Sequence, residues 1–207
     1  MRLGVLVSGR GSNLQAVLAA VADGSLADVE PVLVVSNRPG VRALEVAARA
    51  GVPWRVLAVS QSLTREARDA AIGEALSDAG CDLVLLAGYD QLLAASYFER
   101  FAGRTINIHP SLLPRHGGIG MVGPAVHAAV VAAGDAETGV TIHDVTPALD
   151  AGPPIAQERM PVLPGESAES LAARVLMVEH RLLVGVLAHL SGSMAAASPA
   201  PDRAWRP

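Results

Sequence analysis

The chain contains 207 residues, of which 51% are hydrophobic and only 17% charged, so it is expected to form one compact domain and a largely disordered chain is excluded. Its formal net charge of -4 and isoelectric point of about 5.8 exclude the basic surface on which nucleic-acid binding depends. All 16 basic residues are arginines, which excludes Schiff-base chemistry on a lysine.

Cysteine content and hydropathy favour a cytoplasmic protein. Cys81 is the single cysteine, so no disulfide can form within the chain, and a reducing compartment fits. The apolar run after Met1 is too short for a signal peptide and is followed by Arg10. No stretch approaches the roughly 18 apolar residues that a membrane span needs. We therefore expect neither a membrane partner nor a nucleic-acid partner.

Two kinds of segment alternate through the first half of the chain. Apolar runs predict strands, and the stretches between them have a helical period. The strands are expected at 3–7, 32–35, 54–59 and 83–87, and the helices at 14–22, 41–50 and 65–76. Because the strand runs are continuously apolar, they are typical of a parallel sheet that helices cover on both faces. This half predicts a doubly wound, Rossmann-like α/β unit.

The second half continues the pattern less regularly. Strands are expected at 105–108, 140–145 and 154–162, and helices at 124–133 and 168–190. Only the turn-like sequence TPALDAGP separates the last two strands, so they are expected to pair antiparallel. The fold class is thus a mostly parallel sheet flanked by helices, with antiparallel strands in the C-terminal part. Residues 1–190 form one domain, and the Ser-, Ala- and Pro-rich residues 191–207 predict a flexible tail.

The first candidate site is the sequence SGRGSN, from Ser8 to Asn13, between the first strand and the first helix. Its two glycines allow a sharp turn whose backbone N–H groups, together with the helix N-terminus, suit a phosphate. It is not the dinucleotide fingerprint, because Leu14 stands where a third glycine is needed. The alternative is a structural turn in which Ser12 caps the helix.

The second candidate is NIHPSLLP, at the end of an apolar strand. Asn107 and His109 point to the same side of a strand, so an amide and an imidazole can meet one developing oxyanion. The alternative is a structural histidine at a strand end. Ser111 lacks the surroundings of a serine nucleophile and is expected to cap or hydrogen-bond.

The third candidate is Asp150, on the loop between the last two strands. A carboxylate there can pair with His109, raise the pKa of its imidazole and order a water for proton transfer. The alternative is ordinary turn chemistry. The other histidines do not have metal-ligand spacing, so no metal is expected; they are His116, His127, His143, His180 and His189.

Five segments in the same order resemble the phosphoribosylglycinamide formyltransferase family, across about residues 2–185. They are LVSGRGSNLQA, VLLAGYDQLL, TINIHPSLLPRH, GVTIHDVTPALDAGPPI and ARVLMVEH. The resemblance implies direct transfer of formyl from the co-substrate 10-formyltetrahydrofolate to the amine of glycinamide ribonucleotide, in de novo purine biosynthesis. Its partners would be these small molecules, and the chain would be a monomer or a homodimer.

The resemblance also implies roles for individual residues. Asn107 would stabilise the oxyanion, His109 would be the general acid, and Asp150 its partner carboxylate. The implied substrate-binding residues are Gly11, Ser12 and Asn13 for the phosphate, and Leu176, Met177, Val178 and Glu179 around the ribose. The implied folate-binding residues are Arg65, Tyr89, Asp90, Gln91, Leu92, Asn107, Thr146, Pro147, Ala148 and Leu149.

Two segments depart from the family pattern. Asp90 and Gln91 stand where many members read Met-Arg, which places an anion beside a ligand with a negative tail. Residues 115–123, RHGGIGMVG, are longer and richer in glycine than in many relatives, and a mobile loop near the site is expected.

Three other functions remain open. A formyltetrahydrofolate hydrolase would use the same Asn, His and Asp with water as acceptor. Methionyl-tRNA formyltransferases share the core. Because the sequence starts at its first strand and only a short tail follows the last helix, we expect neither the extra N-terminal domain of the hydrolase nor the tRNA-binding domain of the tRNA enzyme. The third is a non-catalytic nucleotide-binding paralogue.

Overall fold

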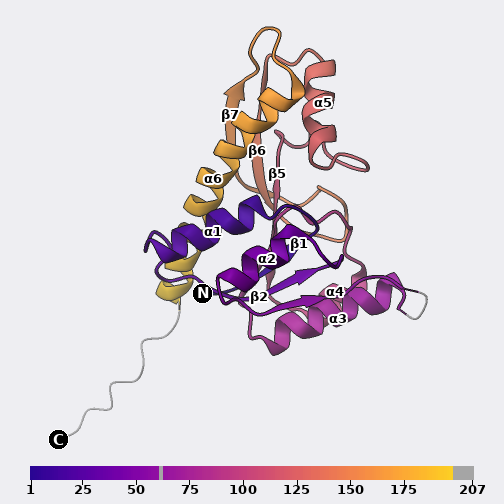
Figure 1. Cartoon of the computed structure of the whole chain (residues 1–207), viewed down its shortest axis with the longest axis vertical. Helices are drawn as coiled ribbons and strands as arrows, with labels where there is room; N and C mark the ends of the chain where they lie inside the picture. Colours follow the sequence, from indigo (N-terminus) through magenta and orange to yellow (C-terminus); the bar gives the residue numbers. More distant parts are fainter. Residues whose placement is uncertain (61–62, 198–207) are drawn as a thin grey trace, which may run out of the picture.

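The computed structural model describes residues 1–60 and 63–197, which form a seven-stranded sheet in the order β3-β2-β1-β4-β5-β6-β7 (Figure 1). The strands are β1 (Arg2–Val7), β2 (Glu30–Ser36), β3 (Trp54–Val56), β4 (Leu83–Leu86), β5 (Arg104–His109), β6 (Glu137–Asp144) and β7 (Pro154–Pro161). The helices are α1 (Ser12–Ala22), α2 (Arg42–Arg49), α3 (Arg65–Asp78), α4 (Ala95–Arg100), α5 (Pro124–Ala132) and α6 (Ala168–Ala197).

Strand directions confirm the predicted fold class. Strands β1 to β5 pair in parallel. Strand β6 pairs antiparallel with β5, and β7 pairs antiparallel with β6. Near the top of Figure 1, β6 and β7 rise beside α5 and the first part of α6, whereas α3 and α4 lie at the bottom.

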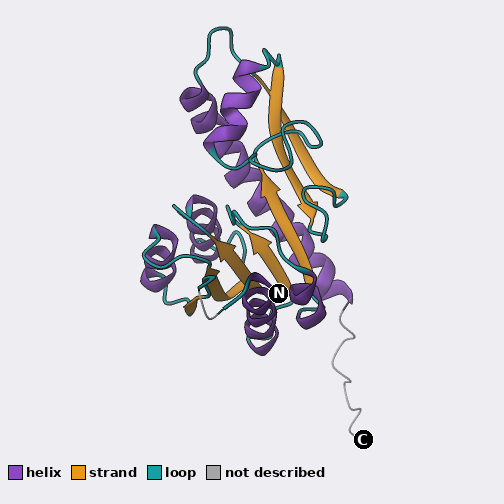
Figure 2. Cartoon of the chain, turned by 90° about the vertical axis from the view of Figure 1, so that its right-hand side faces the viewer, coloured by secondary structure: helices purple, strands orange, loops and turns teal. Residues whose placement is uncertain are grey.

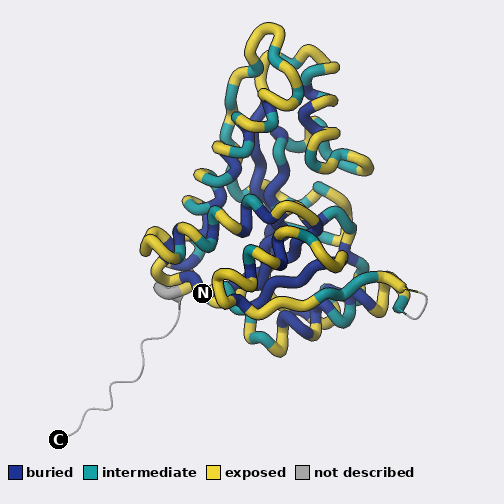
Figure 3. Tube along the Cα trace, in the orientation of Figure 1, coloured by how far each residue is buried: buried dark blue, intermediate teal, exposed yellow. Residues whose placement is uncertain are grey.

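Alternate residues of the central strands face two different cores, which is why their sequences are apolar throughout. In β1, Val5 and Val7 belong to the larger cluster, which α1, α2, α5 and α6 complete. Leu6, between them, belongs to the second cluster, which α3 and α4 cover. The sheet therefore lies between two helical layers (Figure 2), and the buried trace follows the strands (Figure 3).

Several element bounds differ from the sequence prediction; β6, for example, begins at Glu137, three residues before its predicted start. Strand β3 ends at Val56, three residues early. Helix α4 was not predicted; it is only six residues long, and tertiary packing of the fully buried Tyr97 in the second cluster, with its hydroxyl 2.8 Å from that of Thr105 on β5, supports it. Helix α6 continues to Ala197, so residues 191–197 of the predicted tail are helical, and Ser191 is buried. Residues 198–207 of that tail lie outside the described residues.

The strand order positions the site. The chain runs outward from β1 to β2 and β3, and then returns through α3 to β4 on the other side of β1, so the strand order reverses between β1 and β4. Open α/β sheets bind ligands in the crevice at the carboxyl ends of the strands at such a point. The sequences SGRGSN and GYDQLL follow β1 and β4 at this edge, and NIHPS begins in the last three residues of β5. Among the described helices, none is long and apolar enough to cross a membrane.

Candidate active site

A cavity of about 1000 Å³ opens at this edge of the sheet. Its walls come from the loops after β1, β4 and β5, from residues 118–124, from the loop before β7 and from α6. Asn107, His109 and Asp150 all line it. The structure thus brings the three predicted catalytic side chains together, although Asp150 is 41 residues from His109 along the chain.

The glycine-rich loop after β1 forms one end of the cavity. Gly11 is left-handed, with φ of 75°, and it precedes α1 as the N-cap, so Ser12 is the first helical residue and not the cap. A Cβ at Gly11 would lie 2.7 Å from the Cβ of Ala43. The N–H of Ala43 donates to the carbonyl of Gly9 at 3.1 Å. Packing against α2 therefore holds the start of α1 toward the cavity, where its free N–H groups suit an anion.

Polar side chains continue this end of the cavity. The amide nitrogen of Asn13 lies 3.4 Å from Oε1 of Glu179, and Asn13 Oδ1 is buried without a hydrogen bond to any described residue. Burial raises the pKa of Glu179 to about 7, although the hydrogen bond from Asn13 and the charge of Arg10 oppose the rise. Leu176 also lines the cavity. Of the other predicted ribose-side residues, Met177 is 67% exposed and Val178 packs into the core.

The ring of His109 has a defined tautomer. Its Nε2 lies 2.9 Å from the carbonyl oxygen of His116, and a carbonyl only accepts, so Nε2 carries the proton. The other ring nitrogen, Nδ1, lies 4.0 Å from Oδ2 of Asp150. That distance is an ion-pair contact and too long for a direct hydrogen bond. A neutral His109 therefore presents a lone pair toward the carboxylate and the cavity.

Burial decides the protonation of His109. The side chain is 6% exposed, and this desolvation lowers the pKa of the imidazole below 6.5. The carbonyl of His116 and the charge of Asp150 raise the pKa, as predicted for Asp150, but burial outweighs both. The predicted effect of Asp150 is therefore present, and burial, which the sequence does not reveal, sets the net direction.

His143 is a site residue that the sequence reasoning missed. Its Nδ1 lies 2.9 Å from the carbonyl of Asp144, so Nδ1 carries the proton and Nε2 is free to accept. The amide nitrogen of Asn107 donates to that Nε2 at 3.0 Å. His143 Nε2 is also 3.8 Å from Oδ1 of Asp150. The antiparallel register places Asn107 opposite His143, and that pairing was the missing signal.

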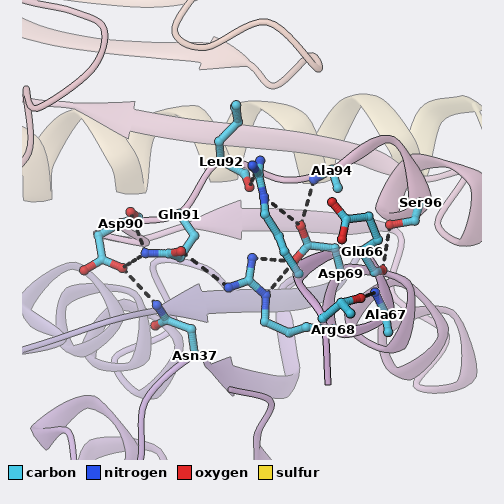
Figure 4. A network of polar contacts seen from close by, with 12 residues as sticks. Asn37, Glu66, Ala67, Arg68, Asp69, Asp90, Gln91, Leu92, Ala94 and Ser96 are labelled. Atoms are coloured by element: carbon cyan, nitrogen blue, oxygen red, sulfur yellow. Dashed lines mark hydrogen bonds and ion pairs between the residues drawn. The ribbon is translucent and has the colours of Figure 1, made fainter. Parts of the chain in front are cut away.

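Side chains of α3 form hydrogen bonds with the loop after β4 (Figure 4). The buried Arg68 donates to Asp69 at 2.7 Å and to Gln91 at 3.4 Å. Asp69 in turn accepts from the N–H of Ala94 at 2.8 Å. Arg65 donates to the carbonyl of Leu92 at 2.8 Å.

The predicted folate-side residues divide into two groups. Those that line the cavity are Tyr89, Asp90, Gln91, Leu92, Asn107, Thr146, Ala148 and Leu149. Arg65 and Pro147 are not among the described residues that line it. Arg65 supports the wall through Leu92 instead.

The carboxylate of Asp90 is mostly buried and has three side-chain partners. Asn37 donates to it at 2.9 Å, Gln91 donates to it at 3.2 Å, and Arg38 forms an ion pair with it. Burial raises the pKa of Asp90, but the hydrogen bond from Asn37, its other hydrogen bonds and the charge of Arg38 together lower it below the usual value. Asp90 is therefore ionised and largely neutralised by Arg38.

These contacts define what the cavity can do. One end suits an anion, and the middle holds an amide donor, an imidazole with a free nitrogen and a carboxylate. Such a set can stabilise an oxyanion and move a proton at one reacting carbon. Among the described residues, no group of three or more His, Cys, Asp or Glu side chains is arranged to hold a metal ion.

Comparison with known proteins identifies the relatives. Residues 1–187 match the formyl transferase family. The chain is 37% identical over 182 residues to the phosphoribosylglycinamide formyltransferase of Escherichia coli, covering 88% of this chain and 83% of that protein. It is 40% identical over 201 residues to the trifunctional purine biosynthetic protein adenosine-3 of Drosophila melanogaster, covering 96% of this chain. The chain spans only 14% of the length of that fly protein.

Solved structures agree with the sequence relatives. Glycinamide ribonucleotide transformylase 1 from Symbiobacterium toebii superposes with a TM-score of 0.85 at 37% identity, covering 93% of this chain and 88% of the other. Phosphoribosylglycinamide formyltransferase from Bacillus halodurans superposes with a TM-score of 0.84 at 30% identity, covering 100% of both chains.

Proposed function

Because the chain belongs to the formyl transferase family, we propose that it transfers the formyl group of 10-formyltetrahydrofolate to the amine of glycinamide ribonucleotide, a step of de novo purine biosynthesis. The observation that carries this proposal is the convergence of Asn107, His109 and Asp150 on one cavity whose far end suits a phosphate. We also propose that it acts in the cytoplasm on these small molecules.

The two ends of the cavity suit the two substrates. The phosphate of the ribonucleotide would bind the N–H groups at the start of α1. The side chains of Glu179 and Asn13 would form hydrogen bonds with the ribose hydroxyls. The folate would lie against the lining residues 89–92, 146, 148 and 149. The amine and the formyl carbon then meet beside Asn107.

The amide and the imidazole have separate tasks in the transfer. The amine lone pair forms a bond to the formyl carbon, and the carbonyl oxygen becomes an oxyanion. Asn107 directs one amide hydrogen to His143, which leaves the second for that oxyanion. Nδ1 of His109 accepts the proton that the new ammonium releases, and the imidazolium then faces Asp150. As the bond from carbon to the folate nitrogen breaks, that proton passes to the departing nitrogen, so charge and protons balance.

The experiment mixes the protein with 10-formyltetrahydrofolate and glycinamide ribonucleotide and follows the absorbance change on deformylation. Signal only with both compounds supports the transferase. Signal with the folate alone identifies a hydrolase instead, and no signal in either mixture identifies a binding protein, so either result overturns the proposal.

Variants of the reacting groups refine this test. We expect His109→Ala and Asp150→Asn to reduce turnover by about a hundredfold or more, the typical cost of losing one such group, while binding of the ribonucleotide stays nearly unchanged. The matched control is His189→Ala, which removes an exposed imidazole from α6. Full activity in either active-site variant contradicts the assignment.

A further inference from the structure

A second histidine–aspartate pair lies directly behind His109. The carbonyl of His116 accepts a hydrogen bond from the Nε2–H group of His109 at 2.9 Å. The side chain of His116 donates a second hydrogen bond, from its own Nε2 to Oδ2 of Asp135 at 2.6 Å. Both side chains of this outer pair are mostly buried, with 16% and 8% of their surface exposed. One residue therefore links the proposed catalytic ring, through its backbone, to a carboxylate outside the cavity.

The backbone of His116 is in a conformation that needs support. Its φ is 53°, in the left-handed region that a residue with a side chain adopts only at a cost. That conformation aims the carbonyl at His109. Since the hydrogen bond to Asp135 is made by the same residue, it helps to hold the unfavourable backbone angle.

The same short segment also holds the proposed partner carboxylate. The N–H of Gly118 donates to Oδ2 of Asp150 at 2.8 Å. Asp150 is itself left-handed, with φ of 50°. Gly117 lies between the two contacts, where an added Cβ would come within 2.5 Å of a Leu113 methyl group. Residues 116–118 therefore set the positions of His109 and Asp150 relative to each other.

The segment is anchored to elements outside the cavity. Arg115 forms an ion pair with Asp135, and its carbonyl accepts from the hydroxyl of Ser111 at 2.6 Å. The hydrogen bond from His116 and the charge of Arg115 lower the pKa of Asp135 below its usual value, so it remains an anion. Asp135 lies between α5 and β6, which pack on the core, and so ties the segment to a rigid part of the fold.

We propose that His116 and Asp135 are positioning residues that fix His109 as the tautomer with its proton on Nε2 and its lone pair on Nδ1 facing Asp150. A neutral imidazole has a single N–H, and the opposite tautomer would place a lone pair against the carbonyl of His116. Nδ1 is then the nitrogen that exchanges protons in the cavity. The catalytic consequence rests on the proposed formyl transfer, whereas the tautomer is a property of the free protein.

The first test measures the tautomer directly. Protein labelled with isotopic nitrogen in its histidines is studied by NMR near pH 8, where His109 is neutral, and His109→Gln identifies its signals. The expected result is one tautomer with the proton on Nε2. In Asp135→Ala we expect a measurable population of the other tautomer. Asp135→Asn, which keeps an acceptor oxygen, is expected to restore most of the original preference.

The second test measures kinetics in the same variants. Asp135→Ala is expected to lower kcat about tenfold or more, a cost typical of losing the group that orients a functional histidine, with little change in KM for the ribonucleotide. The matched control is Glu137→Gln, which breaks the nearby exposed ion pair with Arg159 without touching this chain of contacts. A second variant is His116→Gly, which keeps the left-handed angle freely but loses the side chain, and it serves if Asp135→Ala fails to fold.

The outcomes separate the two proposals. A shifted tautomer in Asp135→Ala or His116→Gly supports the positioning role even if the wild-type protein transfers no formyl group. A folded variant with an unchanged His109 tautomer overturns it, whether or not kcat falls, because the loss is then merely structural. If kcat falls equally in Glu137→Gln and in Asp135→Ala, the positioning role is overturned as well.

Discussion

His143 orients Asn107: Nε2 of the ring accepts the amide hydrogen of Asn107 at 3.0 Å, across the antiparallel pair of β5 and β6. The ring is itself held by the carbonyl of Asp144 at 2.9 Å. This contact decides which way the amide points, because an asparagine can otherwise rotate its oxygen and nitrogen into each other's places. The second amide hydrogen is then available to an oxyanion.

Removing that acceptor is expected to slow turnover. We expect His143→Ala to lower kcat by about tenfold to a hundredfold, the upper figure being the loss of a whole oxyanion donor. The KM for the ribonucleotide is expected to stay constant, since His143 lies beside Asn107 in the middle of the cavity and not at its phosphate end. Steady-state kinetics check this, with His143→Gln as the variant that keeps an acceptor. Unchanged kcat in the alanine variant rules out an orienting role.

The buried carboxyl of Glu179 predicts a pH-dependent stability. Its pKa is about 7 in the folded protein, against 4.5 for an ordinary glutamate. The folded state therefore binds the extra proton between these values, and its stability falls as the pH rises through this window, by up to about 3 kcal/mol. Glu179→Gln lacks this loss, so it is expected to become more stable than the wild type above pH 7.

Urea denaturation at several pH values checks this difference. The control is Glu99→Gln, an exposed glutamate on α4, for which the wild-type pH dependence is expected. Parallel stability curves for the wild type and Glu179→Gln would show that this carboxyl does not titrate in the predicted window.

In the glycine-rich loop, substitution of the two glycines by alanine is expected to have very different effects on stability and phosphate binding. Gly11→Ala combines a left-handed φ with a Cβ only 2.7 Å from that of Ala43, and we expect a destabilisation of about 1–3 kcal/mol and weaker phosphate binding. Gly9→Ala meets no atom within 4 Å and is the matched control. Thermal denaturation and ribonucleotide titration measure both effects. Equal behaviour of the two variants would contradict the packing argument.

The ion pair with Arg38 neutralises the negative charge of Asp90 on the side of the cavity where the folate is proposed to bind. Arg38→Ala uncovers the carboxylate of Asp90 beside a ligand with a negative tail, so the KM for the formyl-folate is expected to rise by up to about fivefold. Adding Asp90→Asn to that variant is expected to bring the KM back. Arg49→Ala, which breaks an exposed pair on α2, is the control. A raised KM that persists in the double variant speaks against charge compensation.

Much of the fold is encoded locally and was therefore predictable. Continuous apolar runs such as residues 83–87 require burial on both faces, and this requirement alone leads to a parallel sheet between helices. The position of Asn107 and His109 at a strand end, two residues apart, places both side chains on one face. The close spacing of β6 and β7 leaves room only for an antiparallel pair.

The missed elements depend on contacts between distant segments. Helix α4 is too short to form on its own and depends on the packing of Tyr97. The extension of α6 beyond Leu190 follows a Ser- and Ala-rich sequence that has no strong local preference, and Ser191 is buried there. The composition of a local segment therefore does not predict such packing.

The sequence by itself determined which chemical groups this protein has at the carboxyl edge of its sheet: an anion-binding turn, an amide, an imidazole and a carboxylate. Only the tertiary structure decided which atoms of those groups face one another. His143 meets Asn107 through strand register, His116 meets Asp135 through packing across α5, and burial lowers the pKa of His109 against the pull of Asp150. Backbone periodicity is set by neighbouring residues, whereas tautomers and pKa values depend on the sum of all surrounding atoms, most of which come from elsewhere in the chain.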